Sequence, residues 1–211
     1  MKKPKIHIDI TSDFICPWCF IGITRIDRIK KTLSPNIDLE VQLKPYLLYP
    51  NIPLVGSPKK YFAKKSKPGL GRALKVEALK ENIKIDYKKI DRIPNSLEAH
   101  RIISLVNDHD KKWALAKAIF IAYFENGRDI GNSDVLVEIA EQLGSELSTL
   151  NTFSHSNIGK ETVLTQVKEA AEKFINVVPT LDFDGKLMVP GLQEEAFWTR
   201  YIKKAALLQQ S

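Results

Sequence analysis

The sequence predicts an α/β fold in which sheet-forming segments at both ends of the chain are separated by a long all-helical segment. Residues 5–12 and 37–43 alternate apolar and polar side chains, as β-strands do, and residues 16–33 between them have helical spacing. Strand-like runs return only at residues 177–183 and 186–189. The chain is therefore expected to begin as β-α-β and to end with a β-hairpin and a helix.

The first three elements have clear sequence signals. In residues 5–12, isoleucines alternate with His7, Asp9 and Thr11, so one face of the strand is more apolar than the other. The next helix opens at Cys16, with Pro17 suited to its first turn, and closes at residues 34–35, Ser-Pro. The second strand places Ile37, Leu39, Val41 and Leu43 on one face.

Helical periodicity dominates the middle of the chain. Four prolines between residues 45 and 58 first indicate an irregular connection. Ser96 and Ser133 are typical of helix starts, and Gly127 and Gly144 follow helix ends. We expect helices at about residues 58–65, 70–82, 96–107, 111–125 and 133–143.

The last part of the chain returns to strands. A helix at about residues 160–174 precedes a strand at 177–183, a tight turn at Asp184-Gly185 and a strand at 186–189. A final helix is expected at about residues 194–208. This order completes a four-stranded sheet.

Composition limits the classes of partner. The formal net charge is +7, and the densest basic stretch is residues 59–67, but no nucleic-acid motif accompanies it, so we expect no nucleic-acid partner. Residues 6–10 carry charge where an export signal needs an apolar run, and no stretch of about 18 apolar residues occurs. We therefore expect a cytoplasmic protein without a membrane partner.

Both cysteines of the chain lie in one four-residue motif, Cys16-Pro17-Trp18-Cys19, at the start of the first helix. Thiol-disulfide exchange needs an attacking thiolate and a second thiol within reach, and free N–H groups at a helix start stabilise negative sulfur. We expect Cys16 to be the exposed nucleophile and Cys19 the more buried, resolving thiol. Pro17 stiffens the first turn, and Trp18 offers an apolar surface to a substrate.

Other interpretations of this motif stay open at this point. The pair is also compatible with half of a zinc site, although the four histidines show no paired spacing, or with two inert core cysteines. We expect no metal and no bound organic cofactor. Pro179, at the start of a late strand, is either an edge-strand proline or a cis proline opposite the cysteines.

With these motifs in this order, the chain resembles the DsbA-like thioredoxin family, specifically its FrnE-type branch, over nearly its full length. Related proteins include 2-hydroxychromene-2-carboxylate isomerases and kappa-class glutathione transferases. Four segments carry the resemblance: residues 12–22 (SDFICPWCFIG), 95–101 (NSLEAHR), 122–131 (AYFENGRDIG), and 178–180 (VPT) with 190–193 (PGLQ).

The resemblance implies a thioredoxin-like fold with a large all-helical insertion. Residues 1–50 and 150–211 would form the thioredoxin-like domain and residues 51–149 the insertion that caps the site. Pro179 would be cis, and Val178, Pro179 and Thr180 would shape a substrate groove with Pro17 and Trp18. The approach to this proline departs from the family pattern, because similar proteins have a glycine before V-P-T where this chain has Val177.

The resemblance and the cysteines together predict a thiol-disulfide oxidoreductase. The related isomerases and transferases have serine at the position of Cys16, because they activate glutathione. The predicted partner is a protein or small-molecule disulfide or dithiol; glutathione and a second copy of the chain are further candidates. The alternatives are a glutathione-dependent isomerase or transferase, and a non-catalytic peptide-binding module.

Three further residues are candidates near the site. His100 belongs to the segment 95–101 and is expected to face the active site from the insertion, as a substrate-binding residue. Asp9 and Asp13 flank the end of the first strand and are candidates to relay the proton of Cys19, although a capping aspartate is an equal interpretation.

Overall fold

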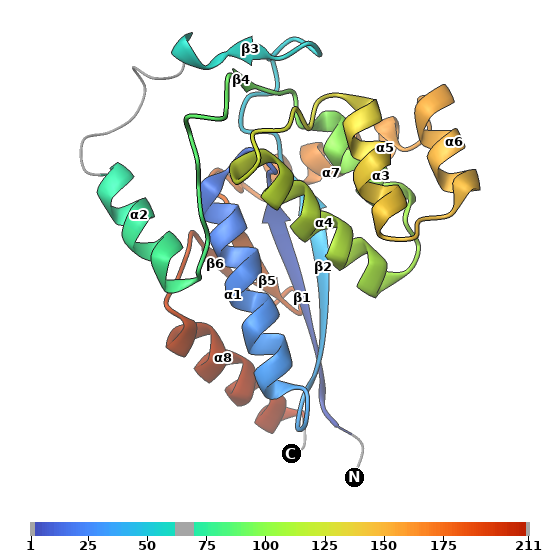
Figure 1. Ribbon diagram of the computed structural model, residues 1–211. Helices are drawn as coiled ribbons and strands as arrows, with labels where there is room; N and C mark the ends of the chain where they lie inside the picture. The colour runs from blue at the N-terminus through green and yellow to red at the C-terminus, as the bar shows by residue number, and fades with distance from the viewer. Residues whose placement is uncertain (1–2, 62–69, 210–211) are drawn as a thin grey trace.

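A computed structural model describes residues 3–61 and 70–209 and contains one four-stranded sheet (Figure 1). β1 (Lys5–Ser12) lies inside the sheet, parallel to the edge strand β2 (Asp38–Pro45). On its other side β1 pairs antiparallel with β5 (Thr180–Phe183), which pairs antiparallel with β6 (Leu187–Pro190). The two ends of the chain therefore build one sheet.

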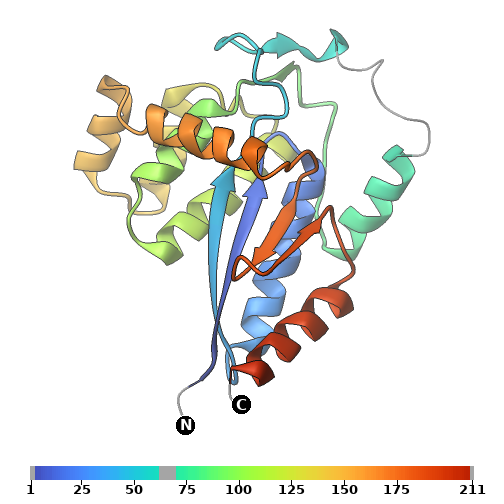
Figure 2. The same cartoon turned by 180° about the vertical axis from the view of Figure 1, so that it is seen from behind.

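The two faces of the sheet differ as the alternation predicts. Ile6, Ile8 and Ile10 are fully buried against α1 (Pro17–Leu33) and α8 (Glu195–Leu208), where they share a cluster with Ile26 and Trp198. Figure 2 shows α7 (Lys160–Glu172), in orange, lying across the ends of β1 and β2 on the opposite face. Because side chains alternate between faces, that second face carries the polar residues of β1 and β2.

Five helices lie between β2 and α7 in the described part of the chain: α2 (Leu70–Lys80), α3 (Leu97–Leu105), α4 (His109–Phe124), α5 (Ser133–Gln142) and α6 (Leu147–His155). α3 to α6 gather on one side of α1, and α2 lies on the other side (Figure 1). Phe120 and Phe124 of α4 stack on Phe20 of α1, with ring centroids 5.5 and 5.8 Å apart. In these ranges no helix has the length and apolarity needed to span a bilayer.

Most predicted elements are confirmed, with ends shifted by a few residues. The helix expected at 58–65 is wrong at residues 58–61: Ser57–Pro58 forms a short strand, β3, paired with β4 (Arg92–Ile93), and Lys59–Tyr61 is a single 3-10 turn. Residues 62–69, which include part of that helix and of the basic stretch, lie outside the described ranges. α6 was not predicted, although its apolar Leu150 and Phe153 are three residues apart and buried.

β3 and β4 form a separate two-stranded sheet and do not pair with the main one. The assignment of residues 51–149 to a distinct insertion domain stays a prediction. The strand expected at residues 177–183 is shorter than predicted because β5 starts at Thr180, after the cis peptide bond between Val178 and Pro179.

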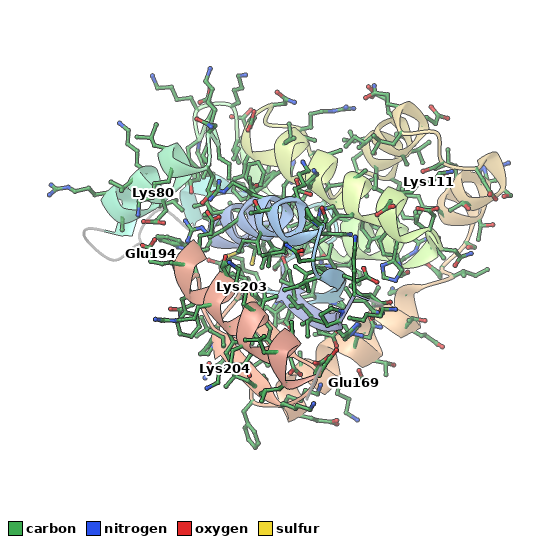
Figure 3. The ribbon with its side chains drawn as sticks, turned by 90° about the horizontal axis from the view of Figure 1, so that it is seen from below. Lys80, Lys111, Glu169, Glu194, Lys203 and Lys204 are labelled. Atoms are coloured by element: carbon green, nitrogen blue, oxygen red, sulfur yellow. The ribbon has the colours of Figure 1, made fainter. Side chains whose placement is uncertain are left out.

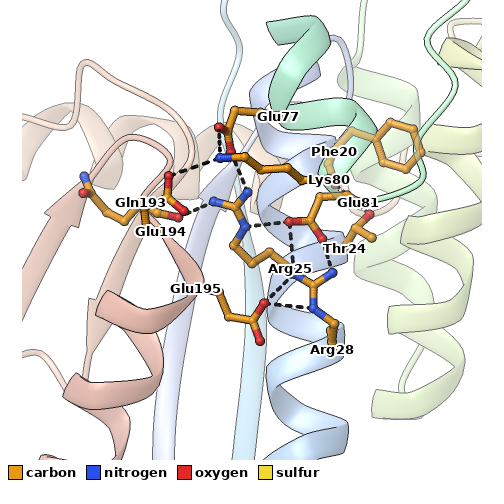
Figure 4. A network of polar contacts seen from close by, with 10 residues as sticks. All are labelled: Phe20, Thr24, Arg25, Arg28, Glu77, Lys80, Glu81, Gln193, Glu194 and Glu195. Atoms are coloured by element: carbon orange, nitrogen blue, oxygen red, sulfur yellow. Dashed lines mark hydrogen bonds and ion pairs between the residues drawn. The ribbon is translucent and has the colours of Figure 1, made fainter. Parts of the chain in front are cut away.

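A buried arginine holds α2 on the rest of the fold (Figure 4). The side chain of Arg25, in α1, is 2% exposed; its Nε donates to Glu81 at 2.7 Å, and its two terminal nitrogens donate to Glu77 and to the Gln193 carbonyl. Burial alone would lower the pKa of Arg25, but the hydrogen bonds that Arg25 donates to Glu77 and Glu81 outweigh burial and raise that pKa. Arg28 also pairs with Glu81, so each buried charge is compensated.

We expect Arg25→Met to lower the free energy of unfolding by about 3–5 kcal/mol, because it leaves Glu81 buried with one fewer cation and the Gln193 carbonyl without its donor. Urea unfolding followed by circular dichroism measures this loss. Lys80→Met is the control: Lys80 lies at the solvent-exposed edge of the same network, near Glu194 (Figure 3), and its replacement should cost only a small fraction as much. Equal losses would contradict the assignment.

Candidate functional site

Cys16 and Cys19 lie at the first turn of α1. Cys16 is the residue before the helix, with extended backbone angles (φ −93°, ψ 113°), and its carbonyl accepts from the backbone N–H of Cys19 at 3.1 Å and of Phe20 at 3.2 Å. Pro17 fits the first helical position because that position needs no N–H donor. One helical turn therefore separates the cysteines, and the Cys16 side chain raises the pKa of the Cys19 thiol.

Both cysteines are free thiols, and both are buried. Cys19 is fully buried, as expected, but Cys16 is only 4% exposed, so the expectation of an exposed Cys16 is wrong. The physical reason is that the Cys16 thiol turns inward: its Sγ donates to the Val178 carbonyl at 3.6 Å, within an apolar cluster that includes Phe14 and Ile15. In this arrangement Cys16 makes no side-chain cap to the helix N–H groups.

The Val178–Pro179 peptide bond is cis, as predicted. The hydrogen bond from the Cys16 thiol to the Val178 carbonyl places this segment next to the cysteine pair. Gly22 of α1 allows the close approach, since a Cβ at this position would lie 3.0 Å from the Pro179 ring. The hydroxyl of Thr180 donates to the Val177 carbonyl at 2.6 Å and is buried. The expected groove residues 178–180 are therefore packed beneath the site, and Val177, 45% exposed, marks its surface.

Burial raises the pKa of the Cys19 thiol, and the neighbouring Cys16 raises it further. The hydroxyl of Ser12 and the backbone N–H of Asp13 act in the opposite direction, because both donate to the sulfur and favour the thiolate. The raised pKa keeps the Cys19 thiol protonated, and the Asp13 N–H and the Ser12 hydroxyl are positioned to stabilise its thiolate.

Asp13 organises the turn that precedes Cys16. Its carboxylate is fully buried and accepts from the backbone N–H of Ile15 at 3.3 Å and of Leu48 at 2.6 Å. Asp9 is on the other face of β1, where it contacts His7 at 3.0 Å and Lys44 at 3.6 Å. The suggestion that Asp9 relays the proton of Cys19 is therefore wrong, because the sheet separates the two.

Trp18 and Pro17 are half-buried at the helix start, and Trp18 packs against the apolar cluster that contains Cys16. His100 is only 7% exposed: its Nε2 lies 3.1 Å from the Tyr46 carbonyl and 3.7 Å from Asp13, and its ring packs on Phe14. The structure thus places His100 behind the turn at residues 12–16, and its role toward a substrate stays a prediction.

Sequence reasoning missed Tyr87. It is 47% exposed and comes from the irregular segment between α2 and β4, and burial of its covered part, followed by the charge of a Cys16 thiolate, raises the pKa of its phenol to about 12. Tyr87 is therefore within electrostatic reach of Cys16. No local pattern marks it, since only the tertiary fold brings this segment to the helix start.

Comparison with known proteins agrees with this geometry. The model of the DSBA-like thioredoxin domain matches residues 7–203. An uncharacterised protein of Bacillus subtilis (strain 168), YwbO, is 25% identical over 194 residues, covering 88% of this chain and 90% of YwbO.

Two solved structures share the fold. The probable DsbA oxidoreductase SCO1869 of Streptomyces coelicolor superposes with a TM-score of 0.81 at 21% identity, covering 95% of this chain and 89% of that one. A 2-hydroxychromene-2-carboxylate isomerase superposes with a TM-score of 0.72 at 18% identity, covering 97% of each chain. At these identities the likeness establishes the fold alone.

The raised pKa of Cys19 predicts how stability depends on pH. In the folded dithiol protein Cys19 keeps its thiol proton above about pH 8.5, the value at which a thiol in the unfolded chain loses its proton. The free energy of unfolding therefore falls as the pH rises through that value toward the higher pKa of folded Cys19. We expect Cys19→Ala to remove this part of the loss. Urea midpoints of the two reduced proteins between pH 7 and 10 test this, and parallel curves would contradict it.

Asp13→Asn should lower the free energy of unfolding by about 1–3 kcal/mol, because an amide offers one acceptor where the buried carboxylate serves two N–H groups. Chemical denaturation measures the loss. Asp9→Asn is the matched control: Asp9 lies on the partly exposed face of β1, just before the turn that holds Asp13, and its replacement should have a smaller effect. If both variants lose the same stability, Asp13 does not organise the turn.

Proposed function

We propose that this chain, which belongs to the DSBA-like thioredoxin family, is a thiol-disulfide oxidoreductase that works through Cys16 and Cys19. One observation carries the proposal: the Cys16 thiol, at the start of α1, donates to the carbonyl that precedes cis Pro179, and Cys19 lies one turn away, where Cys16 raises its pKa. A nucleophile, a resolving thiol and a backbone segment able to pair with a substrate therefore meet at one point.

In the proposed reaction, the Cys16 thiolate attacks one sulfur of a substrate disulfide. A mixed disulfide forms, and the other substrate sulfur leaves as a thiolate. Cys19 then loses its proton and attacks Cys16, which closes the Cys16–Cys19 disulfide and releases the second substrate thiolate. The chain is reduced at the start and oxidised at the end, and the reverse sequence oxidises a substrate dithiol.

The environment of Cys19 suits the second step. Burial keeps Cys19 protonated, so it does not compete with Cys16 for the substrate. When the mixed disulfide forms, the charge on Cys16 is gone and one cause of the raised Cys19 pKa disappears. Ser12 and the Asp13 N–H then stabilise the Cys19 thiolate as it attacks.

Burial of Cys16 implies that a substrate must first displace its thiol from the Val178 carbonyl. The same carbonyl then becomes available to an extended substrate segment, as in strand addition. Pro17, Trp18 and the partly exposed Tyr87 and Val177 would flank this segment. The proposed substrate is a protein or small-molecule disulfide, with glutathione as the simplest candidate and a second copy of the chain as a further partner.

The shared fold does not separate an oxidoreductase from a glutathione-dependent isomerase or transferase. The cysteines at both ends of the motif favour disulfide exchange, because an isomerase that only activates glutathione does not need a resolving thiol. A non-catalytic peptide-binding module would not need the paired thiols at all.

The test is oxidation by excess oxidised glutathione, followed by alkylation and mass spectrometry. We expect the wild-type chain to lose two hydrogens, Cys19→Ser to accumulate a glutathione adduct on Cys16, and Cys16→Ser to react at least tenfold more slowly. Circular dichroism of each variant controls for folding. A wild-type chain that stays a dithiol would contradict the proposal.

A further inference from the structure

A cavity of about 180 Å³ lies on the polar face of the sheet, beside the turn that leads to the cysteine pair. Ser12, Phe14 and His100 are among its lining residues, but neither cysteine is. The cavity is enclosed by the ends of β1 and β2, by α3, by the first turn of α4 and by α7, which crosses the strand ends in Figure 2. Its lining combines polar and basic side chains, chiefly Gln42, Lys44, Ser104, His109, Lys112 and Gln166, with apolar ones such as Phe14, Ile103 and Val163. In the described part of the chain, no carboxylate side chain lines it.

Lys112 is the unusual member of this group. It is half-buried on α4, and within residues 3–61 and 70–209 it forms no ion pair. Burial lowers the pKa of Lys112, and the charge of Lys44 lowers it further. Two lysines therefore line one confined space. Lys44 lies 3.6 Å from Asp9 and donates to the Gln42 side-chain carbonyl at 3.4 Å, whereas Lys112 is partly desolvated beside a second positive charge.

The carboxylates nearest this space are already engaged on its outer side. Asp9 lies 3.6 Å from Lys44 and also contacts His7. Glu40 pairs with Lys5 at 2.8 Å and lies 3.8 Å from His109. His100, which also lines the cavity, is turned toward the Tyr46 carbonyl. Among the described lining residues, Lys112 is thus the cation that no carboxylate pairs with.

We propose that this cavity binds a small oxyanion: inorganic phosphate or sulfate, or the phosphoryl group of a small metabolite. Lys44 and Lys112 supply the charge, and the amides of Gln42 and Gln166 supply neutral donors. The volume is below the range of drug-sized pockets, so the ligand is a small ion or a short phosphorylated group.

The experiment is titration of the full chain with inorganic phosphate by calorimetry and by thermal unfolding, against sodium chloride at equal ionic strength and pH. Besides the wild type it uses Lys112→Met, Lys44→Met and the control Lys111→Met. Lys111 is the neighbouring lysine of α4, but it lies toward the end of α5 (Figure 3), where its Nζ donates to the Gly144 carbonyl at 3.4 Å. All three variants lose the same charge.

We expect saturable phosphate binding in the wild type and in Lys111→Met, and roughly tenfold weaker binding in Lys112→Met and Lys44→Met. Without phosphate, Lys112→Met should melt at a higher temperature than the wild type, because it removes a disfavoured charge; saturating phosphate should reverse this order. This reversal is the specific signature of an anion between the two lysines. A glycerol phosphate titration then distinguishes a free ion from a phosphoryl group.

Two outcomes would overturn the proposal. Phosphate and sulfate stabilise most folded proteins by exclusion from their surfaces, so an equal rise in melting temperature in all four proteins, without heat of binding, would show that effect alone. Saturable binding that Lys112→Met and Lys44→Met leave unchanged would place the ion elsewhere. Neither outcome bears on the cysteine chemistry, which the alkylation experiment tests separately.

Discussion

The guanidinium of Arg25 joins three segments that are distant in sequence: α1, the end of α2 and the connection before α8. Through the Gln193 carbonyl it holds residues 190–193, and Gly191 in turn donates to the Pro179 carbonyl at 2.7 Å. α1 therefore carries the cysteines at its start and, two turns later, the residue that fixes the segment facing them. The geometry of the site therefore depends on the buried charge of Arg25, which lies about 10 residues along the chain from Cys16.

The same packing that positions the thiols also closes the site. Cys16 belongs to the apolar cluster that joins α1 to α4, and its thiol donates to the Val178 carbonyl. A buried nucleophile is protected from indiscriminate oxidants, but it must open to react. In the proposed reaction a substrate strand displaces this contact, so the Val178 carbonyl that masks the thiol is also the group that would bind the substrate.

Local sequence patterns predicted the elements well, since Ile6, Ile8 and Ile10 show the strand period and Cys16 to Leu33 show the helix period. The cysteine motif and cis Pro179 were also predictable, the first from its chemistry and the second from the family resemblance. Burial of Cys16, the position of His100 behind the turn and the approach of Tyr87 were not. Each depends on contacts between segments far apart in the chain, which no local period encodes.

The polar cavity follows from this same alternation. The isoleucines of β1 commit one face of the sheet to α1 and α8, so the side chains between them, with Gln42 and Lys44 of β2, must occupy the other face. α7 covers the end of that face because the chain has to return to pair β5 with β1. A polar strand end covered by a helix leaves charged groups partly desolvated, and in a chain with net charge +7 those groups are more often lysines than carboxylates. A cationic cavity at this position is therefore a consequence of topology and composition together, and an anion is the partner that relieves it.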